Sequence, residues 1–459
     1  MFRRFFAALL AMLMLPLLSL ACLAAPEETG SGSDGIPEAE RELPDTSVCD
    51  CVLLYNIDSG TLMYSENGDK PVYPASTVKL MVALLARELL SERMDERVTI
   101  SKTVVAKAST IKMSLREGEN IPIRDLFTGL LVAGASDAAV ALAEAACGNV
   151  EVFVSRMNVK AKALGMEHTN YVNVTGVDNY SQQTTGNDLL RLCLAAYADD
   201  FIRETVKLAK TTVPSTNMRG VRTLYTRNYL LSRLTYPYYI MNEADGMNAG
   251  STQKAGGCLC ATASIRNTRY LCIVMGGIYT DGVWNDEPVK IWKNFTLAKE
   301  MFQWGAKYYE YRAVISPMQV YGEVKVELAT FSDYVAAIPK KMVEIYVRRD
   351  TPTENVITVE SEMWESTLIA PVEEGVTVGT VRIKDADGRV IGETELVTKN
   401  SLNLSRLKYW EAQALGIIET RAFTVSILLV LLFAVGGVLI TARVRYKRQT
   451  RLALRRQDR

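Results

Sequence analysis

The stretch YPASTVKLMVALLA, residues 73–86, places a serine and a lysine three positions apart at the start of an apolar segment. Residues three apart lie close to the same face of a helix, so the Ser76 hydroxyl and the Lys79 amine can meet. Apolar neighbours make a charged ammonium costly and favour a neutral amine, which can accept the hydroxyl proton. The segment therefore predicts a serine nucleophile with a lysine base. A serine that only caps the helix is the alternative.

The same spacing occurs twice more, from Ser109 to Lys112 and from Ser251 to Lys254. Ser109 lies among polar and charged residues and Ser251 lies in a glycine-rich turn, so neither copy has the apolar surroundings of Lys79. A Ser-x-x-Lys pattern is expected by chance roughly once or twice in a chain of this size, so the spacing alone decides nothing. The order of the surrounding elements has to decide between nucleophile and cap.

The elements around Ser76 follow the order of an α/β sandwich. Two strand patterns precede the serine, a mainly helical stretch follows it to about residue 194, and strand patterns return after residue 211. The expected fold of this domain, 48–310, is one antiparallel sheet drawn from both ends, flanked by helices and joined to an all-helical part. Short alternating strands then predict a small β domain over 311–400.

Both ends of the chain have the composition of membrane-targeting segments. Two arginines precede an apolar run at the N-terminus, which indicates a secretory signal peptide, with lipidation of Cys22 as an open alternative. Near the C-terminus an uncharged apolar run is long enough to cross a hydrocarbon layer of about 30 Å. Eight basic residues follow this run, so the tail is expected in the cytoplasm and the body outside the cell membrane, in a single-pass arrangement. The expected segments are a signal peptide (1–24), an acidic linker (25–47), the two domains, a linking helix (401–421), a transmembrane helix (422–442) and a basic tail (443–459).

The composition excludes several classes of function. The chain has 52 basic and 52 acidic residues and one histidine, His168, which lies in a polar run and is expected at the surface. Because the tail is basic, the exported body is acidic, which argues against nucleic acid as a partner. No cysteine pair has the Cys-x-x-Cys spacing of a zinc site, so neither a metal nor another cofactor is expected. The pairs Cys49/Cys51 and Cys258/Cys260 are compatible with free thiols or with a disulfide between strands.

Along most of its length the chain resembles the low-molecular-mass penicillin-binding proteins that are D-alanyl-D-alanine carboxypeptidases. The similar segments occur in the family's order at 53–81, 118–144, 164–178, 184–192, 244–263 and 370–381. The resemblance implies a β-lactamase/transpeptidase-like domain with Ser76 as acyl-ester nucleophile and Lys79 as its proton acceptor. It also implies that peptidoglycan stem peptides or muropeptides are substrates and that β-lactams are candidate ligands.

Two motifs of that family are altered in this chain. Gly134 and Ser136 stand where the family has the serine that relays a proton to the leaving group and the asparagine that holds the substrate amide. Asn248 and Ala249 stand where the family has the lysine and threonine that bind the terminal carboxylate of the substrate. Gly250, the last residue of the third motif, is retained, which permits close approach of the backbone at this strand.

These departures leave two functions open. One is a serine DD-peptidase that forms an acyl-enzyme on Ser76 and has altered or weakened activity. The other is a catalytically impaired relative that binds peptidoglycan or scaffolds wall enzymes at the membrane. A β-lactamase is disfavoured by the additional β domain and the membrane segment. Lys254, Asn187 and Arg227 are polar side chains that could compensate for the lost groups, and the sequence offers no basis for choosing among them.

Overall fold

The computed structural model of the chain describes residues 42–457 except 235, 354–355 and 365–366. These residues form two compact units, of which the first ends at Tyr308 and the second begins at Tyr309. The expected signal peptide and most of the expected acidic linker lie outside the described residues.

The first unit contains a five-stranded antiparallel sheet in the order β2-β1-β9-β8-β7. Its strands are β1 (Cys51–Asn56), β2 (Thr61–Glu66), β7 (Ala244–Thr252), β8 (Gly256–Ile265) and β9 (Thr268–Gly277). Two of them precede the Ser76 segment and three follow the helical part, so the prediction that both ends of the domain contribute to one sheet is confirmed. Strand β7 lies at an edge, where its outer backbone groups are free of a neighbouring strand of this sheet.

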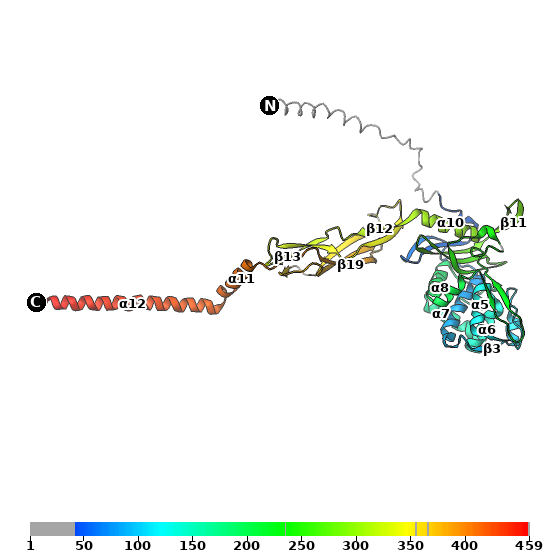
Figure 1. Ribbon diagram of the computed structural model, residues 1–459, viewed down its shortest axis with the longest axis horizontal. Helices are drawn as coiled ribbons and strands as arrows, with labels where there is room; N and C mark the ends of the chain where they lie inside the picture. Colours follow the sequence, from blue (N-terminus) through cyan, green and yellow to red (C-terminus); the bar gives the residue numbers. More distant parts are fainter. Residues whose placement is uncertain (1–41, 235, 354–355, 365–366, 458–459) are drawn as a thin grey trace, which may run out of the picture. The chain divides into compact units, whose positions relative to one another are not determined.

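Helices cover both faces of this sheet (Figure 1). The Leu53 side chain reaches Gly186 in α8 (Gly186–Ala198), and the Leu54 side chain reaches Gly305 in α10 (Lys293–Tyr308). Successive residues of a strand point to opposite faces, so α8 and α10 lie on opposite sides of β1. Because both faces are covered, the central strands are buried along most of their length instead of alternating between buried and exposed residues.

The all-helical part surrounds α3 (Val78–Leu90), the helix that begins next to Ser76. Helix α3 contacts α5, α6, α7 and α8, which explains why its residues from Val78 to Ala86 are buried on every side. The other helices of this part are α4 (Lys102–Lys107), α5 (Ile123–Ala133), α6 (Ser136–Cys147), α7 (Val150–Ala163) and α9 (Asp200–Val206).

The prediction of a mainly helical stretch to about residue 194 is wrong for three segments, 109–122, 94–101 and 164–185. In the first, β4 (Asn120–Pro122) pairs with β3 (Arg97–Thr99) and irregular backbone precedes it. Two further hairpins occur later in the unit: β5 (Lys210–Val213) with β6 (Arg222–Tyr225), and β10 (Tyr279–Trp284) with β11 (Glu287–Trp292).

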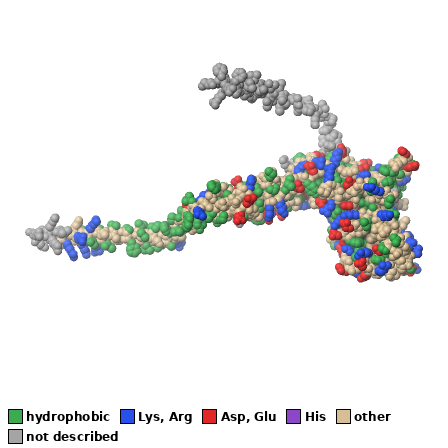
Figure 2. All heavy atoms as spheres, viewed as in Figure 1, with side chains coloured by type: hydrophobic (Ala, Val, Ile, Leu, Met, Phe, Trp, Pro, Cys, Tyr) green, Lys and Arg blue, Asp and Glu red, His purple; other side chains and the backbone are tan. Residues whose placement is uncertain are grey.

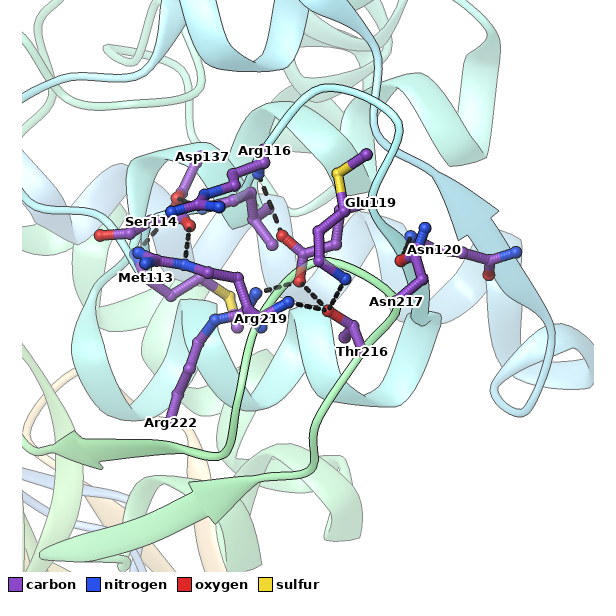
Figure 3. A network of polar contacts seen from close by, with 12 residues as sticks. Met113, Ser114, Arg116, Glu119, Asn120, Asp137, Thr216, Asn217, Arg219 and Arg222 are labelled. Atoms are coloured by element: carbon purple, nitrogen blue, oxygen red, sulfur yellow. Dashed lines mark hydrogen bonds and ion pairs between the residues drawn. The ribbon is translucent and has the colours of Figure 1, made fainter.

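Side chains, not helical hydrogen bonds, hold the irregular segment before β4 (Figure 3). Asp137 at the start of α6 accepts a hydrogen bond from the backbone N–H of Met113 at 3.0 Å. Glu119 is fully buried, forms an ion pair with Arg222 of β6 and accepts a hydrogen bond from the Thr216 hydroxyl at 2.8 Å. A buried carboxylate needs such partners, so the β5–β6 hairpin and the segment before β4 are fixed to each other.

The second unit has a six-stranded sheet in the order β16-β18-β19-β14-β13-β17 and a two-stranded sheet of β12 and β15. The strands are β12 (Tyr309–Ile315), β13 (Gly322–Glu327), β14 (Tyr334–Pro339), β15 (Val343–Arg348), β16 (Ile357–Met363), β17 (Thr367–Ile369), β18 (Thr377–Asp385) and β19 (Val390–Thr398). The small C-terminal β domain expected from the alternating pattern is thus present, with its first strand beginning two residues before the expected boundary at 311.

Two helices follow the second sheet. The expected linking helix, 401–421, is shorter than predicted: α11 spans Arg406–Ile418 and begins after Ser405, whose side chain caps it by accepting from the N–H of Lys408. Helix α12 (Arg421–Gln457) includes the expected span 422–442 and continues through most of the basic tail. Its segment Arg421–Arg451 is long and apolar enough to cross a membrane. Figure 2 shows hydrophobic side chains over most of α12 and basic ones toward its end.

Candidate active site

Ser76 and Lys79 are in direct contact at the start of α3. The chain enters the helix through a 3₁₀ turn, Ala75–Thr77, and Lys79 Nζ lies 2.9 Å from Ser76 Oγ. Lys79 is 1% exposed and Ser76 is 8% exposed. The pKa of Lys79 is lowered from 10.5 to about 7, chiefly by burial and secondly by the positive charge of Arg227, while the negative charge of Asp137 acts in the opposite direction. A large share of the lysine is therefore neutral at physiological pH and can accept the serine proton.

The Ser76 side chain does not cap the helix. Within the described residues neither the 3₁₀ turn nor α3 receives a capping hydrogen bond from a side chain. The Thr77 hydroxyl donates to the Pro74 carbonyl at 2.6 Å, whereas the Ser76 hydroxyl meets the Lys79 amine. The structure thus favours the interpretation as a nucleophile–base pair over the capping alternative.

The backbone next to the serine is strained. Ala75 has a φ of 45°, a left-handed conformation that costs a non-glycine residue roughly 1–2 kcal/mol. Gly176 packs directly against it: a Cβ on this glycine would lie 3.0 Å from Ser76 N and closer still to the Ala75 carbonyl. Asn173 holds this loop, because its side-chain oxygen accepts from the Gly176 N–H at 2.8 Å. Such strain persists only where neighbours impose it, which is typical of a functional segment.

Gly250 on the edge strand β7 lies against the nucleophile. A Cβ at this position would lie 2.7 Å from Ser76 Oγ and 3.2 Å from Ser76 N. Only glycine leaves room for the Ser76 side chain at this position. This steric requirement accounts for the glycine at position 250, although the two residues before it differ from the motif.

Replacing Gly250 by alanine is expected to displace the Ser76 hydroxyl and to lower the rate of acylation by about 100-fold, the cost of misplacing a reacting group by roughly 1 Å. The measurement is labelling of the full chain by a fluorescent penicillin over time. Gly220→Ala is the control, because a Cβ at Gly220 meets nothing within 4 Å. Equal labelling rates for Gly250→Ala and the unmodified chain would contradict this geometry.

The altered second motif does not face the reacting pair. Gly134 has a φ of 64° and ends α5 in the left-handed conformation that favours glycine. Ser136 is fully buried, and its hydroxyl donates to the Ile111 carbonyl and contacts the Ser109 hydroxyl at 2.5 Å. In the part of the chain that the structure describes, Ser136 makes no hydrogen bond to Lys79. Gly134 and Ser136 therefore do not supply the proton-relaying hydroxyl and the amide-binding side chain that the resemblance leads one to expect at these positions.

The altered third motif leaves a polar group without a partner. Asn248 is 4% exposed, and its side-chain oxygen has no hydrogen-bond partner among the described residues. Ala249 is equally buried and has no polar side-chain atom. Neither residue supplies a charge, so a carboxylate at this strand needs a cation from another element.

Arg227 is the cation that lies between the two altered motifs. Its Cγ is 3.5 Å from the position that a Cβ of Gly134 would occupy, and its charge acts on Lys79. Its guanidinium carbon lies 5.6 Å from the centre of the Tyr229 ring, while its buried Nε has no partner among the described residues. The neighbouring Asn228 fixes this segment to β7 by donating to the Gly246 carbonyl at 2.7 Å. Arg227 can therefore bind an anion beside Ser76.

The other two side chains proposed to compensate are engaged elsewhere. Lys254 is in the turn between β7 and β8, where its amine lies 3.0 Å from the centre of the Tyr180 ring. Asn187 is the second residue of α8 and donates to the Asp69 carboxylate at 2.7 Å. The sequence does not distinguish Arg227 from these two residues, because the distance of each side chain from Ser76 depends on the fold.

The remaining candidates show no comparable site. Lys112 and Lys254 are exposed, so the two other Ser-x-x-Lys copies lack a buried base, and His168 is exposed as expected. The seven described cysteines are free, and burial raises the pKa of Cys51 and Cys258 to about 12, which makes these thiols unreactive. Among the described residues no group of three or more His, Cys, Asp or Glu side chains could hold a metal ion.

Comparisons with known proteins agree with this architecture. The family model described as D-alanyl-D-alanine carboxypeptidase matches residues 39–278, and the model of the penicillin-binding protein 5 C-terminal domain matches residues 309–403. The chain is 24% identical over 362 residues to the D-alanyl-D-alanine carboxypeptidase DacF of Bacillus subtilis, covering 76% of this chain and 85% of the relative. It is 27% identical over 375 residues to DacA of Haemophilus influenzae, covering 78% and 87%. Its fold is similar to that of PBP3 from Streptococcus pneumoniae, with a TM-score of 0.57 at 19% identity, covering 78% of this chain and 99% of that one.

Proposed function

Because the chain belongs to the D-alanyl-D-alanine carboxypeptidase family, we propose that it is a penicillin-binding serine peptidase that acts on peptidoglycan stem peptides through an acyl-enzyme on Ser76. The observation that carries this proposal is the buried 2.9 Å contact between Lys79 Nζ and Ser76 Oγ. A neutral amine at hydrogen-bond distance from a hydroxyl is the arrangement that nucleophilic catalysis requires.

The reaction follows from this arrangement. Neutral Lys79 takes the proton of Ser76 as Oγ attacks the carbonyl of the penultimate D-alanine. The N-terminus of α3 stabilises the negative charge that develops near it. The C–N bond then breaks, the proton held by Lys79 returns to the departing amine, and D-alanine leaves. In a second step water attacks the ester and Lys79 accepts its proton. The bond between the acyl carbon and Ser76 Oγ breaks, Lys79 returns the proton to Ser76 Oγ, and the shortened peptide is released.

Arg227 is proposed to bind the terminal carboxylate of the substrate. The family's lysine and threonine are replaced by Asn248 and Ala249, so the charge has to come from elsewhere. Arg227 lines the pocket beside Gly250 and has a buried Nε that no described residue binds. An arginine binds carboxylates with two parallel hydrogen bonds, which compensates in part for the lost pair.

Replacing Arg227 by glutamine is expected to raise KM for diacetyl-L-lysyl-D-alanyl-D-alanine by about 10- to 100-fold, because a hydrogen bond to a charged group contributes about 1.5–3 kcal/mol. The assay measures D-alanine released by the full chain in detergent. Arg227→Lys is the matched control and should recover part of the affinity by restoring the charge. If Arg227→Gln left KM unchanged, the carboxylate would be bound by another group.

A catalytically impaired relative that binds or scaffolds is the second candidate. It is favoured by Ser136, whose hydroxyl is turned to Ile111 and Ser109 and leaves no second-motif group beside Lys79. The same assay separates the two candidates. Release of D-alanine supports the peptidase, whereas labelling of Ser76 by penicillin without any release would support an acylated but inactive relative.

The proposed location is the cell membrane. Helix α12 supplies a segment, Arg421–Arg451, that is long and apolar enough to cross a bilayer, and basic residues follow. With a signal peptide at 1–24, the positive-inside rule would put the two units outside the membrane and the tail in the cytoplasm. Ser76 would then face peptidoglycan.

A further inference from the structure

We infer that the exposed face of the β10–β11 hairpin binds the glycan strand of peptidoglycan, with an aromatic ring stacked on an amino sugar and charged groups bonded to its polar substituents. This inference rests on the proposed action of Ser76 on stem peptides, because those peptides are attached to that glycan. It follows from the chemistry of the exposed face, from the packing of the opposite face, and from the place of the hairpin at the end of the sheet.

The hairpin is a well-formed element at the periphery of the first unit, away from α6 and α7 (Figure 1). Its two strands pair residue by residue without a shift of register. Asn285 and Asp286 have φ of 51° and 65°, the left-handed conformation that a two-residue hairpin turn requires and that these residue types tolerate. The two family models match residues 39–278 and 309–403, so the hairpin lies outside both and its role has to be inferred from its own residues.

One face of the hairpin is packed against the rest of the unit. Residues that lie opposite each other in an antiparallel pair share a face, and successive residues alternate between the two faces. The Trp284 ring centre is 5.3 Å from that of Tyr238, in the 3₁₀ turn Pro237–Tyr239. The backbone N–H of Trp292 donates to the Tyr239 hydroxyl at 2.5 Å. These contacts fix the hairpin and leave its other face to solvent.

The other face combines aromatic and charged side chains. Tyr279 is opposite Trp292 and Asp281 is opposite Lys290, so these four side chains lie on one face. The two ring centres are 5.2 Å apart, and the Lys290 amine lies 2.6 Å from the Asp281 carboxylate and 5.5 Å from the centre of the Tyr279 ring. Tyr279 is 58% exposed, and both charged side chains are exposed. The face therefore offers an accessible ring beside a hydrogen-bond donor and an acceptor.

This combination fits a sugar better than other partners. A pyranose ring has a flat face of C–H groups that packs on an aromatic ring, and its hydroxyl and acetamido groups need donors and acceptors at the edge. An apolar protein partner would have to desolvate the ion pair of Asp281 and Lys290. An anionic lipid surface would be repelled, because the hairpin carries the acidic residues Asp281, Asp286 and Glu287 against the single basic residue Lys290.

The base of the hairpin lies at the same end of the sheet as the end of β7. Gly277, the last residue of β9, is opposite Gly257, and Gly257 is opposite Ser251. Ser251 follows Gly250, the residue that lies against the nucleophile. Neighbouring strands are about 4.8 Å apart, so the base of the hairpin lies about 10 Å from β7.

The expected direction of the substrate leads toward this hairpin. Asn228 donates to the Gly246 carbonyl, so the neighbouring Arg227, which we propose to bind the terminal carboxylate, lies toward the start of β7. A stem peptide bound in this way runs past Ser76 toward the end of β7. About four residues separate its scissile bond from its sugar, and an extended chain of this length spans about 13 Å, which is enough to bring the sugar to the hairpin.

The first test measures binding of sugar alone. The full chain in detergent is titrated by calorimetry with a peptide-free tetrasaccharide of alternating N-acetylglucosamine and N-acetylmuramic acid. We expect saturable binding that Tyr279→Ala weakens by about tenfold. Tyr225→Ala is the matched control and should bind as the unmodified chain does. Tyr225 is 43% exposed on the β5–β6 hairpin, and the amine of Lys210 lies 5.7 Å from its ring, much as Lys290 lies from Tyr279.

The second test measures the contribution of the sugar to catalysis. D-alanine release is compared for a disaccharide pentapeptide and for the same pentapeptide without sugar. The unmodified chain and Tyr225→Ala should show a kcat/KM about tenfold higher for the sugar-linked substrate, and Tyr279→Ala should reduce this ratio to near one. Because the ratio is measured within one protein, it is independent of how much of a variant folds.

The two tests separate this inference from the proposed function. Sugar binding that depends on Tyr279, without D-alanine release from either substrate, supports the hairpin site and counts against the proposed function alone. Absence of sugar binding, or equal binding by Tyr279→Ala and the unmodified chain, would overturn the inference. Equal kcat/KM for the two substrates in the unmodified chain, or binding of phosphatidylglycerol vesicles that Tyr279→Ala abolishes, would also overturn it.

Discussion

Replacing Lys79 by methionine is expected to stabilise the first unit while lowering the rate of acylation of Ser76 by at least about 1000-fold, within the range that general bases contribute. The side chain is 1% exposed, and methionine has a similar length without the amine. Stability and activity are thus expected to move in opposite directions, which is typical of a group kept buried for chemistry.

The expected pH dependence follows from the pKa of Lys79, which burial lowers from 10.5 to about 7. Between these values the unfolded chain binds a proton that the folded chain does not, so the stability of the unmodified protein rises with pH through this window. Below about pH 7 Lys79 is protonated in both the folded and the unfolded chain. The free-energy cost of burying its charge then lowers the stability in full. At pH 7 the cost amounts to about 4 kcal/mol, so Lys79→Met should raise the midpoint of thermal unfolding by roughly 10 °C.

The measurement is thermal unfolding of the full chain in detergent at pH 7 and at pH 10, together with penicillin labelling. The stabilisation by Lys79→Met should be largest at pH 7 and should shrink toward pH 10. Lys112→Met is the matched control, because Lys112 belongs to another Ser-x-x-Lys copy and is exposed. A Lys79→Met variant that unfolds at a lower temperature at pH 7, or that is still labelled rapidly, would show that Lys79 is not the buried base.

The contact between Ser76 and Lys79 could be predicted because its causes are local. Three positions along a helical segment bring the two side chains together, and the apolar residues around Lys79 bury the amine. The antiparallel sheet and the small β domain could also be predicted, because strand patterns before and after a helical region leave few arrangements. Among the Ser-x-x-Lys copies, the apolar surroundings of Lys79 were the signal that distinguished it.

The position of Arg227 could not be predicted, because it depends on contacts between distant segments. The Arg227 side chain reaches Gly134, although helices α6 to α9 lie between the two residues in the sequence. The neighbouring Asn228 holds this segment against Gly246 of β7. The irregular segment before β4 was also missed, because the partner of Glu119 is Arg222, on a hairpin far along the chain. Local sequence patterns carry no information on such pairings.

Ser136 shows a similar limit. From the sequence it was a shortened replacement for asparagine at the site, whereas in the fold its hydroxyl bonds to Ile111 and Ser109. The polar neighbours of Ser109 in the sequence predict an exposed side chain, whereas in the fold it is half-buried against Ser136. Neighbours in the sequence do not reveal these contacts, because they form where Asp137 holds the segment around Met113 against the start of α6.

Loss of the Ser76 hydroxyl is expected to have the largest effect of all, because no other described serine lies against a buried amine. Ser76→Ala removes the only atom proposed to form the covalent bond, so acylation should be abolished and not merely slowed. Ser109→Ala is the matched control, because it removes the serine of another Ser-x-x-Lys copy and should leave labelling intact. The alanine variant should keep its fold, because Ser76 makes no capping hydrogen bond in the described structure.

The most direct measurement is therefore incubation of the full chain and of its Ser76→Ala variant with a fluorescent penicillin, followed by mass spectrometry of the labelled peptide. One label per chain, attached within residues 73–86 and missing from the variant, is the predicted result. Equal labelling of both proteins, or a label attached elsewhere, would contradict the assignment of Ser76 as the nucleophile.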